Sequence, residues 1–336
     1  MMESSAMCRT FFGLVIFFAA WAPSGRAAEP LVLEKTIPLE GVEGRIDHMS
    51  ADVRGNRLFV SALVNKTLEV IDWASGKRIK SVPDLNEPQG VLYAPVNNRV
   101  YVATGGDGRV TVLDGTSFKV IKTVELGKDA DNLRFDAARS LVWVGYGSGS
   151  LAALDLDGKR IADIPVGHHP ESFQLAQTDA RVFVNLPTGK DIAVVDRNSK
   201  SVVAKWGTGL DFSNFPMVLD EPSKRLFVVT RVPARVLVYN TDSGKTVAKF
   251  QTVGDSDDAF YDAARRRLYI VGGEGFIEAY SQDTPDHYTR IARLPTASGA
   301  RTALFVPEAG RLFLAVPHRD QQRAEIRVFK VPETGK

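Results

Sequence analysis

The stretch Arg99-Val-Tyr-Val102 decides the fold, because six further copies of the same short apolar run follow or precede it along the chain. Their central aromatic residues are separated by 42, 42, 40, 44, 42 and 44 positions. Such intervals are typical of proteins that repeat a single small sheet. The sequence therefore predicts one supersecondary unit repeated seven times. The seven aromatic residues are Phe59, Tyr101, Trp143, Phe183, Phe227, Tyr269 and Phe313.

Each repeat has room for four strands. In the second copy, apolar or alternating runs cover 90–94, 99–103, 109–114 and 119–124, and turns rich in Gly, Asn and Asp separate them. Such turns favour tight hairpins between antiparallel strands. Seven four-stranded antiparallel sheets of this length predict an all-β fold, a single seven-bladed β-propeller.

The last repeat supplies only three strands before the chain ends. Residues 31–39 (LVLEKTIPL) have the character of the missing fourth strand. Pairing the two ends of the chain in one sheet would cover an edge that is otherwise open. We therefore expect a propeller over residues 29–336 that is closed by its N-terminal strand.

The first residues have the character of a targeting segment. Arg9 precedes 12 apolar residues, 11–22 (FFGLVIFFAAWA), and small residues follow as far as Ala28. This order predicts a signal peptide over residues 1–28, with an uncleaved N-terminal anchor as the alternative. Cleavage would leave no stable membrane span and a periplasmic or secreted bacterial protein.

Composition excludes several classes of site. The one cysteine, Cys8, lies in the predicted signal peptide, so the mature chain would have no disulfide, thiol nucleophile or thiolate metal ligand. The chain has 42 Lys and Arg against 40 Asp and Glu. This balance gives no general electrostatic attraction to nucleic acid.

A second pattern recurs at the blade ends. It reads apolar-x-Asp-x-x-(Ser/Gly)-x-Lys, then a β-branched strand, with good copies at 70–82, 112–127 and 194–207. The pattern resembles the YVTN-type repeat of YncE-like seven-bladed β-propellers, and the resemblance extends over essentially all of the chain after the leader. A literal Tyr-Val-Thr-Asn is missing; Tyr101-Val-Ala-Thr104 is nearest. The resemblance implies an exported propeller that often binds something in its funnel, and no single reaction, because the fold hosts scaffolds and enzymes alike.

The repeated aromatic also gives a common reference position in every blade. The position 12 residues before each one marks the start of the first strand of a blade, which lines the channel of a propeller. Positions two and four residues further on are nearly all apolar. We therefore expect a polar ring at the channel mouth above two apolar layers. The ring consists of Asp47, Gln89, Asp131, Glu171, Phe215, Asp257 and Arg301.

The four carboxylates of this ring are candidate ligands of a divalent cation, the only cofactor that the sequence suggests. They are Asp47, Asp131, Glu171 and Asp257, with Arg301 as an internal counter-charge. Oxygen-rich sets of this kind suit hard cations. The alternative is that each carboxylate bonds a nearby backbone N–H or arginine and only orders the start of its strand.

Histidines fall on the same face. The register places His48, His168, His169 and His318 in its loops, and Asn132 and Asp258 complete the predicted ligand-binding funnel. Imidazoles bind metals and carry protons near neutral pH, so His48 and His169 are candidate catalytic residues. The alternative is that these are solvated loop histidines.

Two functions follow from these residues. The first is a noncatalytic scaffold that binds a small ligand, a peptide or a periplasmic protein through its funnel. The alternative is a metal-dependent hydrolase or lyase of the lactonase kind, in which the cation polarises a carbonyl and a histidine moves the proton. An acidic mouth would repel phosphate and argues against nucleic acid.

Overall fold

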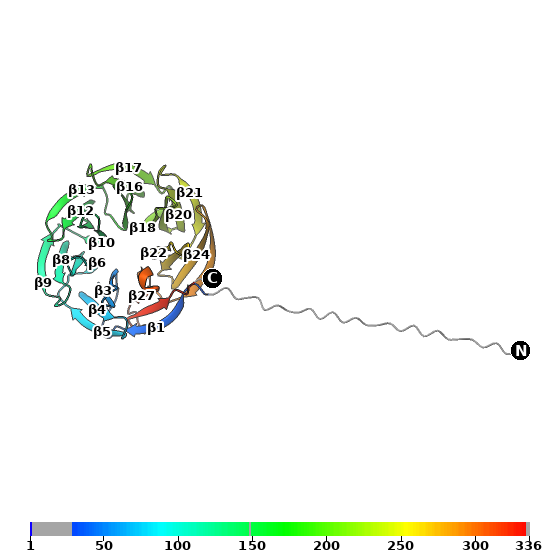
Figure 1. Cartoon of the computed structure of the whole chain (residues 1–336), viewed down its shortest axis with the longest axis horizontal. Helices are drawn as coiled ribbons and strands as arrows, with labels where there is room; N and C mark the ends of the chain where they lie inside the picture. Colours follow the sequence, from blue (N-terminus) through cyan, green and yellow to red (C-terminus); the bar gives the residue numbers. More distant parts are fainter. Residues whose placement is uncertain (2–28, 148, 334–336) are drawn as a thin grey trace.

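Seven four-stranded sheets stand around a central axis like the blades of a propeller, and this confirms the predicted fold (Figure 1). The computed structural model describes Met1 and residues 29–147 and 149–333. The predicted signal peptide, apart from Met1, lies outside the described residues. Within them the one helix is the 3-10 helix η1, Pro307–Ala309, and no helix is long and apolar enough to cross a bilayer.

The blades follow one another in chain order. The first has β2 Met49–Asp52, β3 Arg57–Ala62, β4 Thr67–Asp72 and β5 Lys77–Val82; the second has β6 Pro88–Ala94, β7 Arg99–Thr104, β8 Arg109–Asp114 and β9 Val120–Glu125. The third has β10 Ala130–Asp136, β11 Leu141–Tyr146, β12 Ser150–Asp155 and β13 Arg160–Pro165; the fourth has β14 Phe173–Leu175, β15 Arg181–Leu186, β16 Asp191–Asp196 and β17 Ser201–Gly207. The fifth has β18 Phe212–Asp220, β19 Arg225–Val232, β20 Ala234–Asn240 and β21 Thr246–Gln251; the sixth has β22 Ser256–Asp262, β23 Arg267–Gly272, β24 Phe276–Thr284 and β25 His287–Pro295. The seventh has β26 Ala303–Val306, β27 Arg311–Val316, β28 Glu325–Lys330 and β1 Val32–Pro38.

The repeated aromatic occupies the third position of the second strand in every blade, and each copy is buried. From there it packs against the following blade. The ring of Phe59 stacks on that of Tyr93 in the second blade, with centroids 5.5 Å apart, and Phe313 meets Trp73 of the first blade at 5.2 Å. Aromatic pairs at these distances add to the energy of burial. The residue that sets the sequence period thus joins neighbouring blades.

The arginine two positions before the aromatic also reaches the next blade. Arg57 donates a hydrogen bond to the carbonyl of Gly115, and Arg99 donates one to that of Leu156 at 2.5 Å. Both carbonyls lie in the turn that follows the third strand of the neighbouring blade. The seam between these blades is therefore polar at its outer end and apolar inside.

The ring is closed by β1, which pairs antiparallel with β28 as the outermost strand of the seventh blade. This confirms the predicted closure by the N-terminal strand. Glu34 in β1 accepts hydrogen bonds of 2.7 and 2.9 Å from Arg311 in β27. A two-contact pair of this kind also fixes the orientation of the guanidinium.

In the first strands, the side chains that face the channel are not the ones that the aromatic spacing predicted. They lie one position away along each strand. Met49, Val91 and Leu133 belong to packed cores within and between the blades. Side chains alternate along a strand, so the residues next to them point into the channel. Most side chains of the two expected apolar layers therefore pack into the blades, although Met49, Val91 and Leu133 also border the axial cavity. The lining residues next to these layers along the strands are His48, Gly90, Asn132, Ser172, Pro216 and Asp258, and below them Ser50, Leu92, Arg134, Gln174, Val218, Phe260 and Leu304.

Candidate functional site: the mouth and the axial channel

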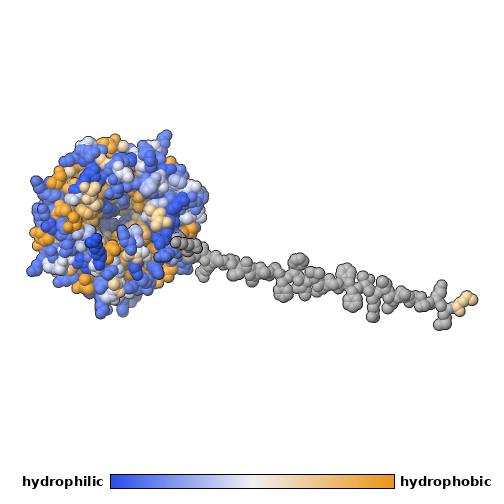
Figure 2. Space-filling model, in the orientation of Figure 1, coloured by the Kyte–Doolittle hydropathy of each residue, from blue (hydrophilic) through white to orange (hydrophobic). Residues whose placement is uncertain are grey.

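The predicted ring gathers at one end of the channel. Six of its seven members line a cavity of about 150 Å³, called the mouth below. The seventh, Asp47, is buried beside it and accepts a hydrogen bond from Arg45 at 3.0 Å. Figure 2 shows one face of the ring hollowed at its centre. The mouth residues are Arg45, His48, Gln89, Asp129, Asp131, His169, Glu171, Phe215, Arg231, Asp257 and Arg301.

One half of the mouth is built from arginines. Asp257 lies 2.6 Å from Arg231, 3.3 Å from Arg301 and 3.8 Å from Arg45. Burial works to lower the pKa of Arg45, but Asp47 and Asp257 outweigh it and the pKa is raised. The guanidinium of Arg45 is therefore held as a cation.

The remaining contacts complete this arginine half. Arg301 also pairs with Asp255 at 2.8 Å, and the guanidinium of Arg231 lies 3.8 Å above the ring of Phe215. Three arginines thus face three carboxylates, those of Asp47, Asp255 and Asp257. The mouth is not uniformly acidic, contrary to the expectation from the ring alone, because Arg45 and Arg231 come from outside the ring positions.

The opposite half is a cluster of Asp131, His169 and Glu171. One ligand atom from each of the three lies within 4.8 Å of the others. His169 bonds the carbonyl of Gly147 through Nδ1 at 2.6 Å, and its Nε2 lies 3.9 Å from Asp131. Within the described residues, no arginine or lysine forms an ion pair with Asp131 or Glu171. Histidines, and not arginines, are therefore the basic groups beside these carboxylates.

Burial and charge change the titration of the cluster. Burial, together with the nearby charge of Asp131, raises the pKa of Glu171. Burial alone would lower the pKa of His169, but the nearby carboxylate of Asp131 and the hydrogen bond to the carbonyl of Gly147 outweigh it, so this pKa is raised. Both groups therefore hold their protons to higher pH than usual.

Gly90 allows the close approach that places Asp131. A Cβ added at Gly90 would lie 2.1 Å from the carbonyl oxygen of Asp131. Gly90 lies in the first strand of the second blade. A residue with a side chain at this position would push the third blade away. The backbone that carries Asp131 is thus fixed by contact with its neighbour.

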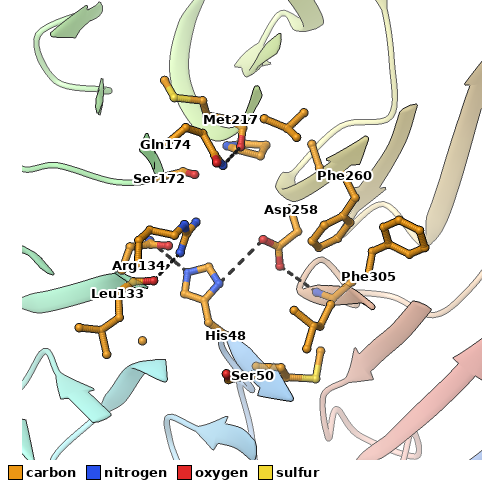
Figure 3. Close-up of a pocket in the computed structure, with 18 of the residues that line it drawn as sticks. His48, Ser50, Leu133, Arg134, Ser172, Gln174, Met217, Asp258, Phe260 and Phe305 are labelled. Carbon is orange, nitrogen blue, oxygen red and sulfur yellow. Dashed lines mark hydrogen bonds and ion pairs between the residues drawn. The ribbon is translucent and has the colours of Figure 1, made fainter. Parts of the chain in front are cut away.

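His48 lies between the mouth and the axial channel and lines both. Its Nε2 is 3.2 Å from Asn132 Nδ2, and its Nδ1 is 3.9 Å from Asp258 Oδ1 (Figure 3). Burial favours a lower pKa for His48, but Asp47, Asp258 and Asp131 together raise it. Burial raises the pKa of Asp258 to about 7, although the charge of His48 opposes the shift.

Beneath the mouth the channel holds a larger cavity of about 390 Å³. Figure 3 shows His48, Arg134, Gln174 and Asp258 around this space. Apolar side chains make up much of the remaining wall. They include Leu92, Val218, Phe260 and Leu304.

The structure narrows the predicted site. Asp47 and Asp257 are held by arginines and do not belong to the cluster of Asp131, His169 and Glu171. Their part in a metal site stays a prediction, as do the catalytic roles of His48 and His169. His168 is exposed and lines neither cavity, and His318 pairs with Glu43 at 2.8 Å.

Sequence reasoning missed three arginines that matter here. Arg231 lies four residues after its blade aromatic, a place where the other blades have Leu, Gly or Pro. Arg134 lies nine residues before its aromatic, where no other blade has a charged residue. Comparing the blades at every position counted from the aromatic would have found both arginines. Arg45 lies 14 residues before Phe59, at a position where other blades carry mouth residues such as His169.

Comparison with known proteins supports the fold. No protein-family model matches the chain. The WD repeat-containing protein AAC3 of Dictyostelium discoideum is 22% identical over 215 residues, 62% of this chain and 41% of that protein. The uncharacterized protein YncE of Salmonella typhi is 25% identical over 118 residues, 35% of this chain and 33% of that protein. The matches thus span less than half the length of each of these curated relatives.

A solved structure matches along almost the whole chain. It is a chain of the crystal structure of a mitotic checkpoint complex, with a TM-score of 0.76 and 12% identity, and the alignment covers 97% of this chain and 99% of that chain. At this identity the likeness concerns the fold. The chain is a seven-bladed β-propeller.

Proposed function

We propose that this protein is an exported, noncatalytic binding propeller that holds a divalent cation at Asp131, His169 and Glu171. One observation carries the proposal. Asp131 is 5% exposed, and its Oδ1 is buried without a hydrogen-bond partner among the described residues. A buried polar atom of this kind costs free energy unless it is paired. A cation at the cluster would supply the missing partner.

The ligand set suits a metal of intermediate character. Two carboxylates and one imidazole favour Mn²⁺ or Zn²⁺, and oxygen ligands alone would favour Ca²⁺. Metal ligands must lose their protons before they bind. Because the pKa values of His169 and Glu171 are raised, binding would release protons.

Export and family membership are parts of the same proposal. The apolar segment at 11–22 and the small residues after it support a signal peptide. The blade-end repeat and the partial match to YncE support a relationship to YVTN-type propellers. A protein or peptide partner on the same face is compatible with the fold that the chain shares with a member of a multi-protein complex.

The test is a thermal unfolding experiment on the chelator-treated protein with added MnCl₂, ZnCl₂ or CaCl₂, together with elemental analysis of the untreated protein. We expect at least one cation to raise the melting temperature, and His169→Gln to abolish the rise. His168→Gln is the matched control, because His168 is its exposed neighbour. Absence of any shift, and of metal in the untreated protein, would exclude the cation site.

A metal-dependent hydrolase is the second candidate, and the position of His48 favours it. His48 Nε2 lies 4.0 Å from Asp131 and also faces the larger cavity. A histidine beside a cation and a substrate cavity could move a proton. Hydrolysis of γ-butyrolactone or an aryl ester that requires both the cation and His48 would favour this candidate. A His48→Gln variant that keeps its metal-induced shift and loses hydrolysis would identify the proton carrier.

A further inference from the structure

The channel below the mouth contains an arginine that has no ionic partner among the residues that the structure describes. Arg134 donates one hydrogen bond, from Nη1 to the carbonyl of Leu133 at 2.8 Å. Its guanidinium also lies 5.5 Å from the centre of the Phe173 ring. In the described part of the chain, no carboxylate forms an ion pair with it. Its remaining donors face the cavity (Figure 3).

This arrangement contrasts with the arginines of the mouth. Arg45, Arg231 and Arg301 each have a carboxylate within 3.0 Å. Burial lowers the pKa of Arg134, and the charges of Asp258 and Asp131 offset this only in part. Enclosed charges are normally paired, because removing an ion from water is costly. Arg134 therefore keeps an unused capacity to bind an anion.

The walls around Arg134 define what kind of anion would fit. Leu92, Val218, Phe260 and Leu304 offer apolar surface, and the hydroxyls of Ser50 and Ser172 and the amide of Gln174 line the same space. Gln174 is held in place, because its Nε2 donates to the carbonyl of Met217 at 2.7 Å. Mostly apolar pockets of several hundred cubic ångströms with a few fixed polar groups are typical of small-molecule sites.

We propose that the axial channel binds a small organic monoanion, with its carboxylate on Arg134 and its apolar body against Leu92, Val218, Phe260 and Leu304. Guanidinium matches the two oxygens of a carboxylate in a single plane. The site is separate from the cluster of Asp131, His169 and Glu171, and it needs no cation there.

Charge favours a monoanion over a phosphate dianion. Arg134 is the only arginine or lysine that lines the cavity within the described residues, and Asp258 lines it too. A second negative charge on the ligand would meet the carboxyl of Asp258, and the imidazole of His48 already faces that carboxyl at 3.9 Å. The apolar wall would also remain uncovered by inorganic phosphate.

The experiment uses isothermal calorimetry in the presence of EDTA, so that the mouth carries no cation. The probes are 3-phenylpropionate, its neutral amide 3-phenylpropanamide, and inorganic phosphate. We expect the carboxylate to bind at least about tenfold more tightly than the amide, as one charge-assisted contact implies. Arg134→Met and Arg134→Gln should each weaken carboxylate binding by a similar factor, and Arg54→Met, at an exposed arginine, should leave it unchanged.

Several results would overturn the proposal. They are equal binding of the acid and the amide, unchanged binding by both Arg134 variants, tighter binding of phosphate, and no binding of 3-phenylpropionate to the wild-type protein. Arg134→Gln serves if Arg134→Met does not fold. Because EDTA is present throughout, a negative result would reject anion binding in the channel without affecting the cation proposal. The thermal unfolding experiment tests the cation proposal separately.

Discussion

Arg197 of the fourth blade donates a hydrogen bond of 2.6 Å to Asp136 of the third blade, and both side chains are buried. The other donors of the guanidinium bond the carbonyls of Ala176, Asp179 and Ala180. All three nitrogens of the guanidinium therefore donate to protein groups. It joins two blades through a polar contact at a place where most of the seam is apolar.

Removing one partner of this pair should be costly. Asp136→Ala would leave a buried guanidinium without a counter-charge, and we expect a loss of about 3–5 kcal/mol in the free energy of unfolding. Urea denaturation measures it. Asp157→Ala is the control, because Asp157 pairs with Arg99 while its side chain is 83% exposed; that change should cost less than ~1 kcal/mol. Equal losses in the two variants would contradict the role of Arg197.

The repeated aromatic should matter through packing. Phe183 is 1% exposed and lies beside Trp206. Phe183→Ala should therefore destabilise the protein by about 3–5 kcal/mol, through lost burial and the cavity that remains. Phe212→Ala provides the comparison, because Phe212 is 37% exposed. Chemical denaturation of both variants is the measurement, and similar midpoints would argue against packing as the reason for the repeat.

The sequence was sufficient to predict the blades because a single packing solution is repeated. Phe59 and its six counterparts meet the same kind of neighbour in each blade, so one spacing marks every second strand. The closing strand could be predicted too, since the seventh repeat left one partner missing and residues 31–39 had the right character. Both inferences depend on the periodicity of the repeat, which is visible in the sequence itself.

The details of the mouth could not be predicted in the same way. The aromatic spacing located Asp257. The ion pairs of Asp257, however, involve Arg231, from the end of a second strand, and Arg45, from a loop. Such pairings depend on the direction of long side chains across several blades. The prediction assigned the channel lining to the wrong face of the first strands. Side chains alternate along a strand, so an error of one residue moves every assigned side chain to the other face. Arg134 was overlooked for this reason.

Asp258 should give the protein a pH-dependent stability. Its pKa is raised to about 7 in the folded state, against about 3.9 when unfolded. Between these values the folded protein binds more protons than the unfolded chain, so the contribution of Asp258 to stability falls as the pH rises. Asp258→Asn should flatten this decline in urea denaturation from pH 4.5 to 8. An unchanged slope would contradict the assignment, and Asp157→Asn, at an exposed aspartate, controls for a general loss of charge.

The cluster of Asp131, His169 and Glu171 should respond to pH in opposite directions with and without a cation. The raised pKa of His169 stabilises the cation-free fold fully below about pH 6.5, and this contribution is lost as the pH rises through the folded-state pKa. The raised pKa of Glu171 likewise favours the fold at low pH. A bound cation needs both groups deprotonated, so its stabilising effect should grow with pH.

The measurement is the difference in melting temperature with and without MnCl₂ at pH 6, 7 and 8. We expect this difference to increase at each step in the wild-type protein. Glu171→Gln removes a charged ligand and should abolish most of the difference at every pH, whereas His168→Gln should reproduce the wild-type series. A shift that is largest at pH 6 would mean that Mn²⁺ binds without displacing these protons, and the cation would then have to lie elsewhere than at His169 and Glu171.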